Sequence, residues 1–478
     1  MRRALVLLWL AACGTDRVVA PVIDTPANDA DATATGLDDI TLTVAHAGAD
    51  RDLVSQNFSH GADIELGGVP FGDDLVIHMS GFVGQSTVAY GRTCSFAVSS
   101  SVAAPSPHLF FTRTVKFADT QVLDAHDNPT LPAIRVDGVG VAFLGGALLL
   151  NGGTPGASGL TPVTIPERYD PATNRLTTLG QMVDRSRGAY ALLGNGSKVV
   201  VLGGVASGQG AQVMEVIDSQ TVDQLAFPGV PRADLTATQL VDGQVLVVGG
   251  QTPDAKSSDE LDLIDPSDSS VVVHKLDTQL MTPRWQHTAT RLSDDLGSPV
   301  LIAGGTNEGG MAIAAAELFE PLDSKLSISF SGMMKTPRYR HKALRLPDGS
   351  IVFIGGLNAS GTPLFGLEQF TRDAGFSTVQ NALPMDAGVV DFAAVNLPDG
   401  RILITGGRTE VGGAPVNTAY ILRLDPVDGM IDVIATDHMS VARAGHQMAV
   451  LCDGTVLISG GNTTSTIERY NPPPAGRR

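Results

Sequence analysis

The chain has 478 residues, of which 54 are glycine, and only 17% of its residues are charged, against usual levels of roughly 7% glycine and 25% charge. Because tight turns between short strands need glycine at positive φ, this composition predicts an all-β protein. The formal net charge is −18, and Lys and Arg are not clustered, which argues against a nucleic-acid partner.

Residues 1–13 have the order of an export signal. A basic start at Arg2 and Arg3 precedes nine apolar or small residues, which are too few to span a bilayer because a helix needs about 20. The segment ends in Leu-Ala-Ala-Cys, which resembles the lipobox of bacterial lipoproteins. The resemblance implies cleavage before Cys13, lipidation of Cys13 and a place in the cell envelope. Gly14, where the related sorting pattern has Asp for inner-membrane retention, favours the outer membrane. The alternative is a chance Cys after a generic signal.

Two segments lie between this signal and the rest of the chain. Residues 14–38 mix Ala, Asp, Thr and Pro without an apolar period, which predicts a flexible tether. Residues 39–107 contain five or six short runs of β-formers between turn residues, which predict a small β-sandwich-like domain. Cys94 lies in this domain and Cys452 lies far along the chain. A disulfide is permitted in an oxidising compartment, and two isolated small apolar side chains are the alternative.

From residue 131 onward, apolar strands ending in a Gly-Gly doublet recur seven times. The first glycine of each doublet is at 152, 203, 249, 304, 355, 406 and 460, so the intervals are 51, 46, 55, 51, 51 and 54 residues. An Asp-Gly pair often lies six residues earlier and predicts a type I′ hairpin turn. A period near 50 fits a four-stranded propeller blade.

These recurrences resemble the Kelch repeat, in which the doublet closes the second strand of each blade. The resemblance spans residues 131–472 and implies a seven-bladed Kelch-type β-propeller, which we assign to residues 108–478. The last repeat lacks a fourth strand, because the chain ends in a proline-rich segment that cannot supply one. We therefore expect residues 109–125 to form the outer strand of the seventh blade and to cover its edge.

Two charged positions also recur, an arginine seventeen to twenty residues before the doublet and an acid near the end of the third strand. Only the sixth repeat lacks them, with Val389 and Leu422 in their places. Loss of both from one repeat leaves no charge unpaired only if arginine and acid pair within a blade. We therefore expect six structural ion pairs: Arg135–Glu167, Arg185–Glu215, Arg232–Asp262, Arg284–Glu317, Arg338–Glu368 and Arg443–Glu468. A cationic ring at the channel mouth is the alternative.

The sequence offers little support for catalysis, and we assign no catalytic residue, metal or other cofactor. His287, His341 and His446 occupy equivalent first-strand positions, but they belong to the fourth, fifth and seventh blades and do not converge as ligands. Galactose oxidase is a Kelch propeller enzyme, and its copper–radical residues have no counterparts here that can be carried over. The Asp-box turns of sialidases are also missing.

The leading functional hypothesis is a non-catalytic binding or scaffolding lipoprotein for a protein or glycan of the cell envelope. The alternative is a propeller enzyme acting on carbohydrate with a non-standard site. We expect the ligand on the face with the long, variable loops. Trp285 and Tyr339, with Gln286 and Arg340 beside them, are the candidate stacking platform. The alternative is that both rings are core residues packed between blades. Oligomeric state has no signal in the sequence.

Overall fold

The structure is a computed structural model that describes residues 16–26, 36–49, 51–58, 64–100, 105–150, 163–206, 209–267, 270–321, 327–425 and 427–474. These residues form strands and turns with no helix among them, which confirms the all-β prediction. The predicted signal and Cys13 lie outside this part of the chain. Two compact units are present: Met1–Thr25, Asp29–Thr114 and Gly476–Arg478 in the first, Pro26–Asn28 and Val115–Ala475 in the second.

The main layer of the first unit is an antiparallel sheet. Its strands pair in the order β10 (Thr112–Arg113), β7 (Ser86–Arg92), β6 (Gly72–Val83), β3 (Asp39–His46) and β4 (Asp52–Phe58), and β8 (Phe96–Val98) also pairs with β6. Two smaller pairings join β1 (Asp16–Val19) to β5 (Leu66–Pro70) and β2 (Val22–Asp24) to β9 (His108–Phe110). Val19, Leu66, Leu42 and Ile77 share one buried core, so β1 and β5 pack with the main sheet.

The stretch 14–38 differs from the tether expected there, because it contains β1 and β2. Val19 is fully buried, and Ile23 packs against the same core. The apolar side chains are few and follow no long period, but β-branched residues at strand positions bury well against a neighbouring strand. A short pairing of this kind depends on partners distant in sequence, here β5 and β9, which local composition does not reveal.

The second unit consists of sheets that follow the seven repeats, and we call them the first to seventh repeat sheets. The first contains β14 (Val139–Phe143), β15 (Gly146–Leu150), β16 (Glu167–Asp170) and β17 (Arg175–Thr178), extended by β12 (Val122–Leu123) and β13 (Pro129–Thr130). The second contains β18 (Ala189–Leu193), β19 (Lys198–Leu202), β22 (Val213–Ile217) and β23 (Val222–Ala226), and β20 (Val205–Ala206) with β21 (Gln209–Gly210) forms a small hairpin beside it.

The next four repeat sheets each have four antiparallel strands in chain order. The third contains β24 (Thr236–Gln239), β25 (Val245–Val248), β26 (Glu260–Ser267) and β27 (Ser270–Gln279). The fourth contains β28 (Thr288–Arg291), β29 (Val300–Ala303), β30 (Ala315–Glu320) and β31 (Ser327–Met333). The fifth contains β32 (Lys342–Arg345), β33 (Ile351–Ile354), β34 (Gly366–Thr371) and β35 (Gly375–Ala382). The sixth contains β36 (Ala393–Asn396), β37 (Ile402–Thr405), β38 (Ala419–Leu424) and β39 (Ile431–Ala435).

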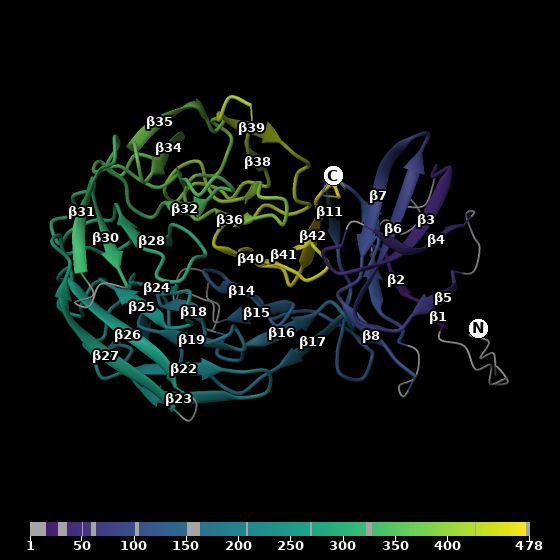
Figure 1. Cartoon of the computed structure of the whole chain (residues 1–478). Helices are drawn as coiled ribbons and strands as arrows, with labels where there is room; N and C mark the ends of the chain where they lie inside the picture. The colour runs from purple at the N-terminus through teal and green to yellow at the C-terminus, as the bar shows by residue number, and fades with distance from the viewer. Residues whose placement is uncertain are drawn as a thin grey trace. The chain divides into compact units, whose positions relative to one another are not determined.

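Figure 1 shows the repeat sheets following one another around a common centre, with their first strands innermost. First strands of successive sheets lie in contact from β18 through β24, β28, β32 and β36 to β40, and β40 contacts β14. The second strands are buried along almost their whole length, because neighbouring sheets cover both of their faces. This burial explains why each of these strands is a continuous apolar run rather than an alternating one.

The seventh repeat sheet combines strands from distant parts of the chain. β40 (His446–Val450), β41 (Val456–Gly460) and β42 (Ile467–Asn471) come from the last repeat, and β11 (Lys116–Asp119) pairs with β42 in register from Lys116 with Asn471 to Asp119 with Glu468. Of the segment 109–125, only this central part joins the seventh sheet. Its start lies in β9 and β10 of the first unit, and its end lies in β12 of the first repeat sheet.

We predict that β11 stabilises the second unit through Phe117. The Phe117 ring lies 4.9 Å from the Tyr470 ring and packs against the core shared by the sixth and seventh sheets. Phe117→Ala should lower the free energy of unfolding by about 2 kcal/mol, less than the 3–5 kcal/mol of a fully buried Phe. The measurement is urea unfolding of the full chain. Lys116→Ala, which removes an exposed side chain from the same strand, is the control and should have little effect. Equal stability of both variants would contradict the role of β11.

Candidate functional site

The structure brings together all six predicted arginine–acid pairs within single repeat sheets. Every one of the six arginines is at most 4% exposed, and every acid is at most 7% exposed. Arg284 Nη2 lies 2.5 Å from Glu317 Oε1, and the corresponding distance from Arg338 to Glu368 is 3.0 Å. The remaining contacts are Arg135–Glu167, Arg185–Glu215, Arg232–Asp262 and Arg443–Glu468.

Backbone groups add further hydrogen bonds to each pair. Glu368 accepts hydrogen bonds from the backbone N–H groups of Lys335 (2.7 Å) and Thr336 (2.8 Å) in addition to the Arg338 guanidinium. Arg338 in turn donates to the carbonyl oxygen of Gly355, the first glycine of its own doublet. Additional hydrogen bonds of this kind offset part of the cost of burying an ion pair. These residues therefore serve structure, and they tie the loop before the first strand to the third strand.

The glycine doublets join each repeat sheet to the next. The backbone N–H of Gly305, the second glycine of its doublet, donates to the carbonyl oxygen of Arg338 in the following sheet at 2.9 Å. A Cβ on Gly304 would lie 2.6 Å from that oxygen, so no other residue fits there. Gly461 of the seventh sheet donates in the same way to Arg135 of the first sheet at 2.7 Å. The first doublet, at 152–153, lies outside the described residues.

The sixth sheet replaces the ion pair with a different contact. Val389 and Leu422 are fully buried apolar residues in place of arginine and acid. Tyr420, two residues before Leu422, donates its hydroxyl proton to Asp386 at 2.7 Å, and Thr418 donates to the Asp386 carbonyl oxygen at 3.0 Å. Burial raises the pKa of Tyr420, and the hydrogen bond to Asp386 acts in the same direction. No sequence pattern predicted this exchange, because its residues do not align with the ion-pair positions.

The three aligned histidines link neighbouring sheets instead of meeting at one point. Nε2 of His287, His341 and His446 lies within hydrogen-bond distance of Thr236 (3.0 Å), Thr288 (2.9 Å) and Thr405 (2.7 Å) of the preceding sheet. Burial lowers the pKa of all three, that of His446 to about 3, and nearby arginines act in the same direction. Each ring is therefore uncharged near neutral pH. No group of three His, Cys, Asp or Glu able to hold a metal occurs in the described part of the chain.

Seven equivalent residues, one from each repeat, lie in a ring shortly before the first strands of the repeat sheets, and we call them the mouth ring. Each member lies two positions after the repeat arginine or after Val389, and each has a positive φ between 51° and 63°. The members are Asp137, Arg187, Asp234, Gln286, Arg340, Asp391 and Gly445. Backbone N–H groups of Asp234, Gln286 and Arg340 donate to the preceding member's carbonyl oxygen at 2.8–3.1 Å, so the backbone fixes these positions.

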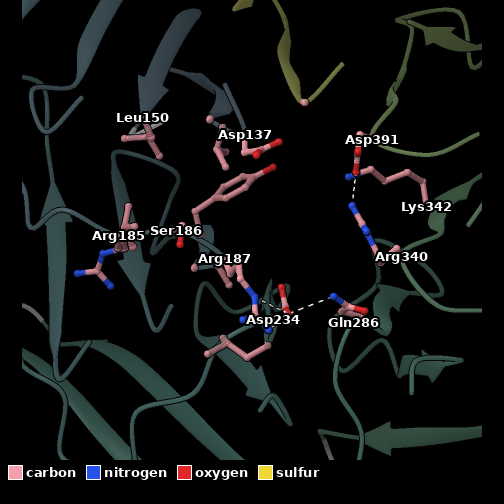
Figure 2. Close-up of a pocket in the computed structure, with 18 of the residues that line it drawn as sticks. Asp137, Leu150, Arg185, Ser186, Arg187, Asp234, Gln286, Arg340, Lys342 and Asp391 are labelled. Carbon is pink, nitrogen blue, oxygen red and sulfur yellow. Dashed lines mark hydrogen bonds and ion pairs between the residues drawn. The ribbon is translucent and has the colours of Figure 1, made fainter. Parts of the chain in front are cut away.

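Ionic contacts run around the ring between neighbouring sheets (Figure 2). Arg187 pairs with Asp234, with Nε 2.8 Å from Oδ2, and Gln286 donates to the same carboxylate at 3.2 Å. Arg340 pairs with Asp391. The side chains of the two arginines are 42% and 37% exposed, whereas those of their acids are 15% and 27% exposed. The arginine side chains are therefore the more exposed partners, and the more buried carboxylates fix their positions.

A cavity of 630 Å³ opens inside the mouth ring. All seven ring members line it, together with Tyr190, Lys342 and the three histidines. Tyr190 and Lys342 are both exposed to the cavity. A cavity of this size fits a small ligand or the tip of a larger one. Neither Tyr190 nor Lys342 was singled out by the sequence, because the repeats carry no aromatic or lysine at equivalent positions.

Only two of the four residues of the predicted stacking platform line the cavity. Gln286 and Arg340 line the cavity, but Trp285 and Tyr339, one position earlier, do not. Tyr339 packs against the core between the fifth and sixth sheets. Trp285 lies beneath Arg187, whose Cζ is 5.7 Å from the indole centroid, a cation–π geometry. The sequence pattern that marks the cavity is the position two residues after the repeat arginine, where polar side chains recur, and not the position one residue after it.

No family model and no curated protein matches the sequence. Among solved structures, a fungal alcohol oxidase of the AA5 family, in complex with copper, is 16% identical; the match covers 72% of this chain and 75% of the oxidase with a TM-score of 0.54. A structure of YjhT is also 16% identical, over 59% of this chain and 93% of that one, with a TM-score of 0.45. At this level of identity, the match to the oxidase shows a shared fold and nothing about activity.

The described residues do not fit a copper centre like that of an oxidase. Nε2 of each cavity histidine lies within hydrogen-bond distance of a threonine hydroxyl, and among the described residues no three His, Cys, Asp or Glu side chains converge as a metal would require. Cys452 is disulfide-bonded, as is Cys94, so neither thiol is available as a ligand. The site therefore offers charged and polar side chains rather than a metal donor set.

We predict that Arg338 and Glu368 are energetically coupled. Arg338→Ala leaves a buried carboxylate without its cation and should lower the free energy of unfolding by about 3–5 kcal/mol. The double change with Glu368→Ala should cost less than the sum of the two single changes, with a coupling of about 0.5–3 kcal/mol. Denaturant unfolding of the four proteins measures the cycle. The exposed pair Arg372 and Glu320 is the control and should show almost no coupling. Additive effects at Arg338 and Glu368 would refute the prediction.

A second prediction concerns acid stability. The unfolded chain protonates its histidines below pH 6.5, whereas folded His446 resists protonation down to pH 3, because its pKa is lowered to about 3. Stability from this histidine is therefore present above pH 6.5 and is lost as pH falls, by up to about 1.4 kcal/mol per pH unit. His446→Gln should flatten the fall in unfolding free energy between pH 6.5 and 4.5. An identical pH dependence in the variant and the wild type would show that His446 is protonated when folded.

Proposed function

We propose that the chain is a cell-envelope binding or scaffolding protein and that the mouth ring with its cavity binds a protein or glycan ligand. The observation that carries this proposal is the backbone conformation of the ring. A left-handed residue other than glycine costs on the order of 1–3 kcal/mol, and such strain gathers at functional sites. Gly445 demonstrates that glycine is compatible with the position. Six of the seven positions nevertheless keep a polar side chain, and all six face one cavity.

The chemistry of the mouth ring suits a polar ligand. Arginines presented by carboxylates are preorganised donors, so little side-chain entropy is lost when they bind. Arg187 is held on three sides, by Asp234, by Gln251 at 3.0 Å and by the ring of Trp285. The ring contains both acidic and basic side chains. Its arginines can donate hydrogen bonds to carbonyl or carboxylate groups of a ligand, and its aspartates can accept hydrogen bonds from hydroxyl or amide groups.

We further propose that the repeat sheets form a complete seven-bladed Kelch-type propeller and that residues 39–107 belong to a separate β-sandwich-like domain. The contact of β40 with β14 and the hydrogen bond from Gly461 to Arg135 support closure of the propeller. Export and anchoring through Cys13, with the outer membrane as the destination, remain proposals based on the signal. The disulfide-bonded state of Cys94 and Cys452 supports an oxidising compartment. Among the described residues, no helix is long and apolar enough to cross a bilayer.

A propeller enzyme acting on carbohydrate is the second candidate. The shared fold with an alcohol oxidase and the cavity volume favour it, because small-molecule sites are concave and of this size. Fold alone does not determine function, however. An enzyme of this class would turn over a sugar in the presence of the native chain, whereas a binding protein would retain it unchanged.

The test separates binding from folding by replacing strained ring residues with glycine. Gln286→Gly and Arg340→Gly relieve the left-handed conformation, so the melting temperature should stay level or rise. Affinity for a ligand found by a screen of glycans and envelope proteins against the full chain should fall about tenfold or more if the ring binds it. Arg372→Ala, on an exposed pair away from the ring, is the control. Unchanged affinity in both glycine variants would refute the site.

Mass spectrometry of the N-terminal peptide from native membranes tests the Cys13 anchor.

A further inference from the structure

Four exposed methionines lie next to the mouth ring, and we call them the methionine rim. Met281, Met311, Met333 and Met385 are between 59% and 74% exposed, whereas the other methionines in the described part of the chain are buried or half-buried. An apolar side chain that stays in water contributes little free energy to folding. Exposed apolar side chains that gather in one place are typical of a surface that binds another molecule.

All four methionines lie on the face that carries the mouth ring. The strands of the fourth, fifth and sixth sheets are antiparallel and follow chain order, so the connections before the first strand and after the second strand leave on one face. Met311 lies in the β29–β30 connection of the fourth sheet. The other three lie near the start of connections that lead to a ring member: Met281 precedes Gln286, Met333 precedes Arg340 and Met385 precedes Asp391. The methionine rim is therefore confined to one sector, at the fourth, fifth and sixth sheets.

The same sector carries an excess of positive charge. Asp391 contacts Arg340, and its carboxylate lies 3.8 Å from Arg408 Nε. Lys342 lies beside Arg340 and Asp391 in the cavity, and it forms no direct ion pair with an acid of the described residues (Figure 2). Three cations therefore share one acid, in a chain whose formal net charge is −18. This imbalance favours a ligand that supplies a negative charge at Lys342.

We propose that this sector is a docking surface for a partner protein whose loop presents an acidic side chain flanked by apolar side chains. The acid pairs with Lys342 in the cavity, and the apolar side chains pack on the methionine rim. Methionine is unbranched and adapts its shape to an apolar partner. Its thioether is only a weak hydrogen-bond acceptor, so the rim suits protein side chains better than the hydroxyl groups of a glycan. This inference rests on the proposed function, because it names the partner class for the same mouth.

The overall charge of the chain restricts where the partner can carry its acid. A net charge of −18 repels a partner that is acidic over its whole surface. Exposed charges are screened beyond about 8 Å at physiological ionic strength, so a single acid close to Lys342 still experiences the local cations. The acid therefore belongs on a loop that enters the cavity, and the surface around that loop is apolar where it meets the rim.

Selection of displayed loops tests the proposal on the full chain. The probes are two phage libraries of short, disulfide-closed loops with variable flanks, one with a central Asp and one with a central Asn. Loops with the central Asp should be enriched about tenfold over loops with Asn, which corresponds to one charge-assisted contact. Leu, Ile, Phe and Val should be over-represented in their flanks. Equal enrichment of the two libraries, or a preference for polar flanks, would overturn the proposal.

Variants of the chain then locate the binding of a selected loop. Lys342→Gln should weaken binding about tenfold and remove its dependence on salt, because the charge is lost and the length is kept. Met281→Ser and Met311→Ser should each weaken binding about threefold or more. Lys198→Gln, at the start of β19, and Leu296→Ser, at a side chain that is 67% exposed, are matched controls in hairpins of the opposite face and should leave the affinity unchanged. Melting temperatures of all variants establish that they fold.

The outcomes separate this inference from the proposed function. Equal weakening in Met281→Ser and Leu296→Ser, or none in Lys342→Gln, would overturn the docking surface. A glycan that is lost in Gln286→Gly, together with equal enrichment of the two libraries, would overturn this inference and leave the proposed function standing. Loop binding that depends on Lys342 and the methionine rim, with no envelope protein or glycan affected by the ring variants, would support the docking surface and overturn the binding role of the ring.

Discussion

The buried arginine found in six of the seven repeats is the contact on which the second unit depends. Its guanidinium binds an acid on the third strand and the first glycine carbonyl of its own sheet, and its backbone oxygen accepts a hydrogen bond from the preceding sheet. One residue therefore links three segments that are distant in sequence. Because the charge is buried, any loss of its partner is costly, which makes the junction between sheets specific as well as stable. Glycine is required in the doublet, since a Cβ would collide with that same oxygen.

The mouth ring follows from this junction. The chain leaves the arginine, or Val389 in the sixth repeat, turns through a left-handed residue and enters the first strand. Every sheet except the seventh, which has Gly445 at this position, therefore delivers one side chain to the same ring. The scaffold fixes the backbone, and the side chains vary from acid to base to amide without disturbing the core. This separation of a repeated structural residue from a variable one two positions later explains how a regular fold can carry an irregular polar surface.

The junction between the seventh and first sheets has extra polar contacts. Arg469 on β42 binds Asp453, donates to Thr455 and lies 3.3 Å from the Tyr169 hydroxyl of the first sheet. Arg469 is 1% exposed and Asp453 is 6% exposed, so the seventh sheet contains a second buried ion pair in addition to Arg443–Glu468. The seventh sheet is completed by β11, a strand from before the repeats. These added polar contacts lie where the two ends of the repeat array meet.

The sequence determined the all-β class, the seven repeats and the pairing partner of each repeat arginine, because strand period, turn residues and aligned charges are local or repeated patterns. The coincident absence of arginine and acid in the sixth repeat was enough to predict pairing within a sheet. Only the tertiary structure decided that Trp285 packs against Arg187 and does not line the cavity, and that Tyr190 and Lys342 share that cavity with the ring. These relations join residues from different repeats that no pattern aligns. The position of β1 and β2 was decided in the same way, since each short strand exists only through its distant partner.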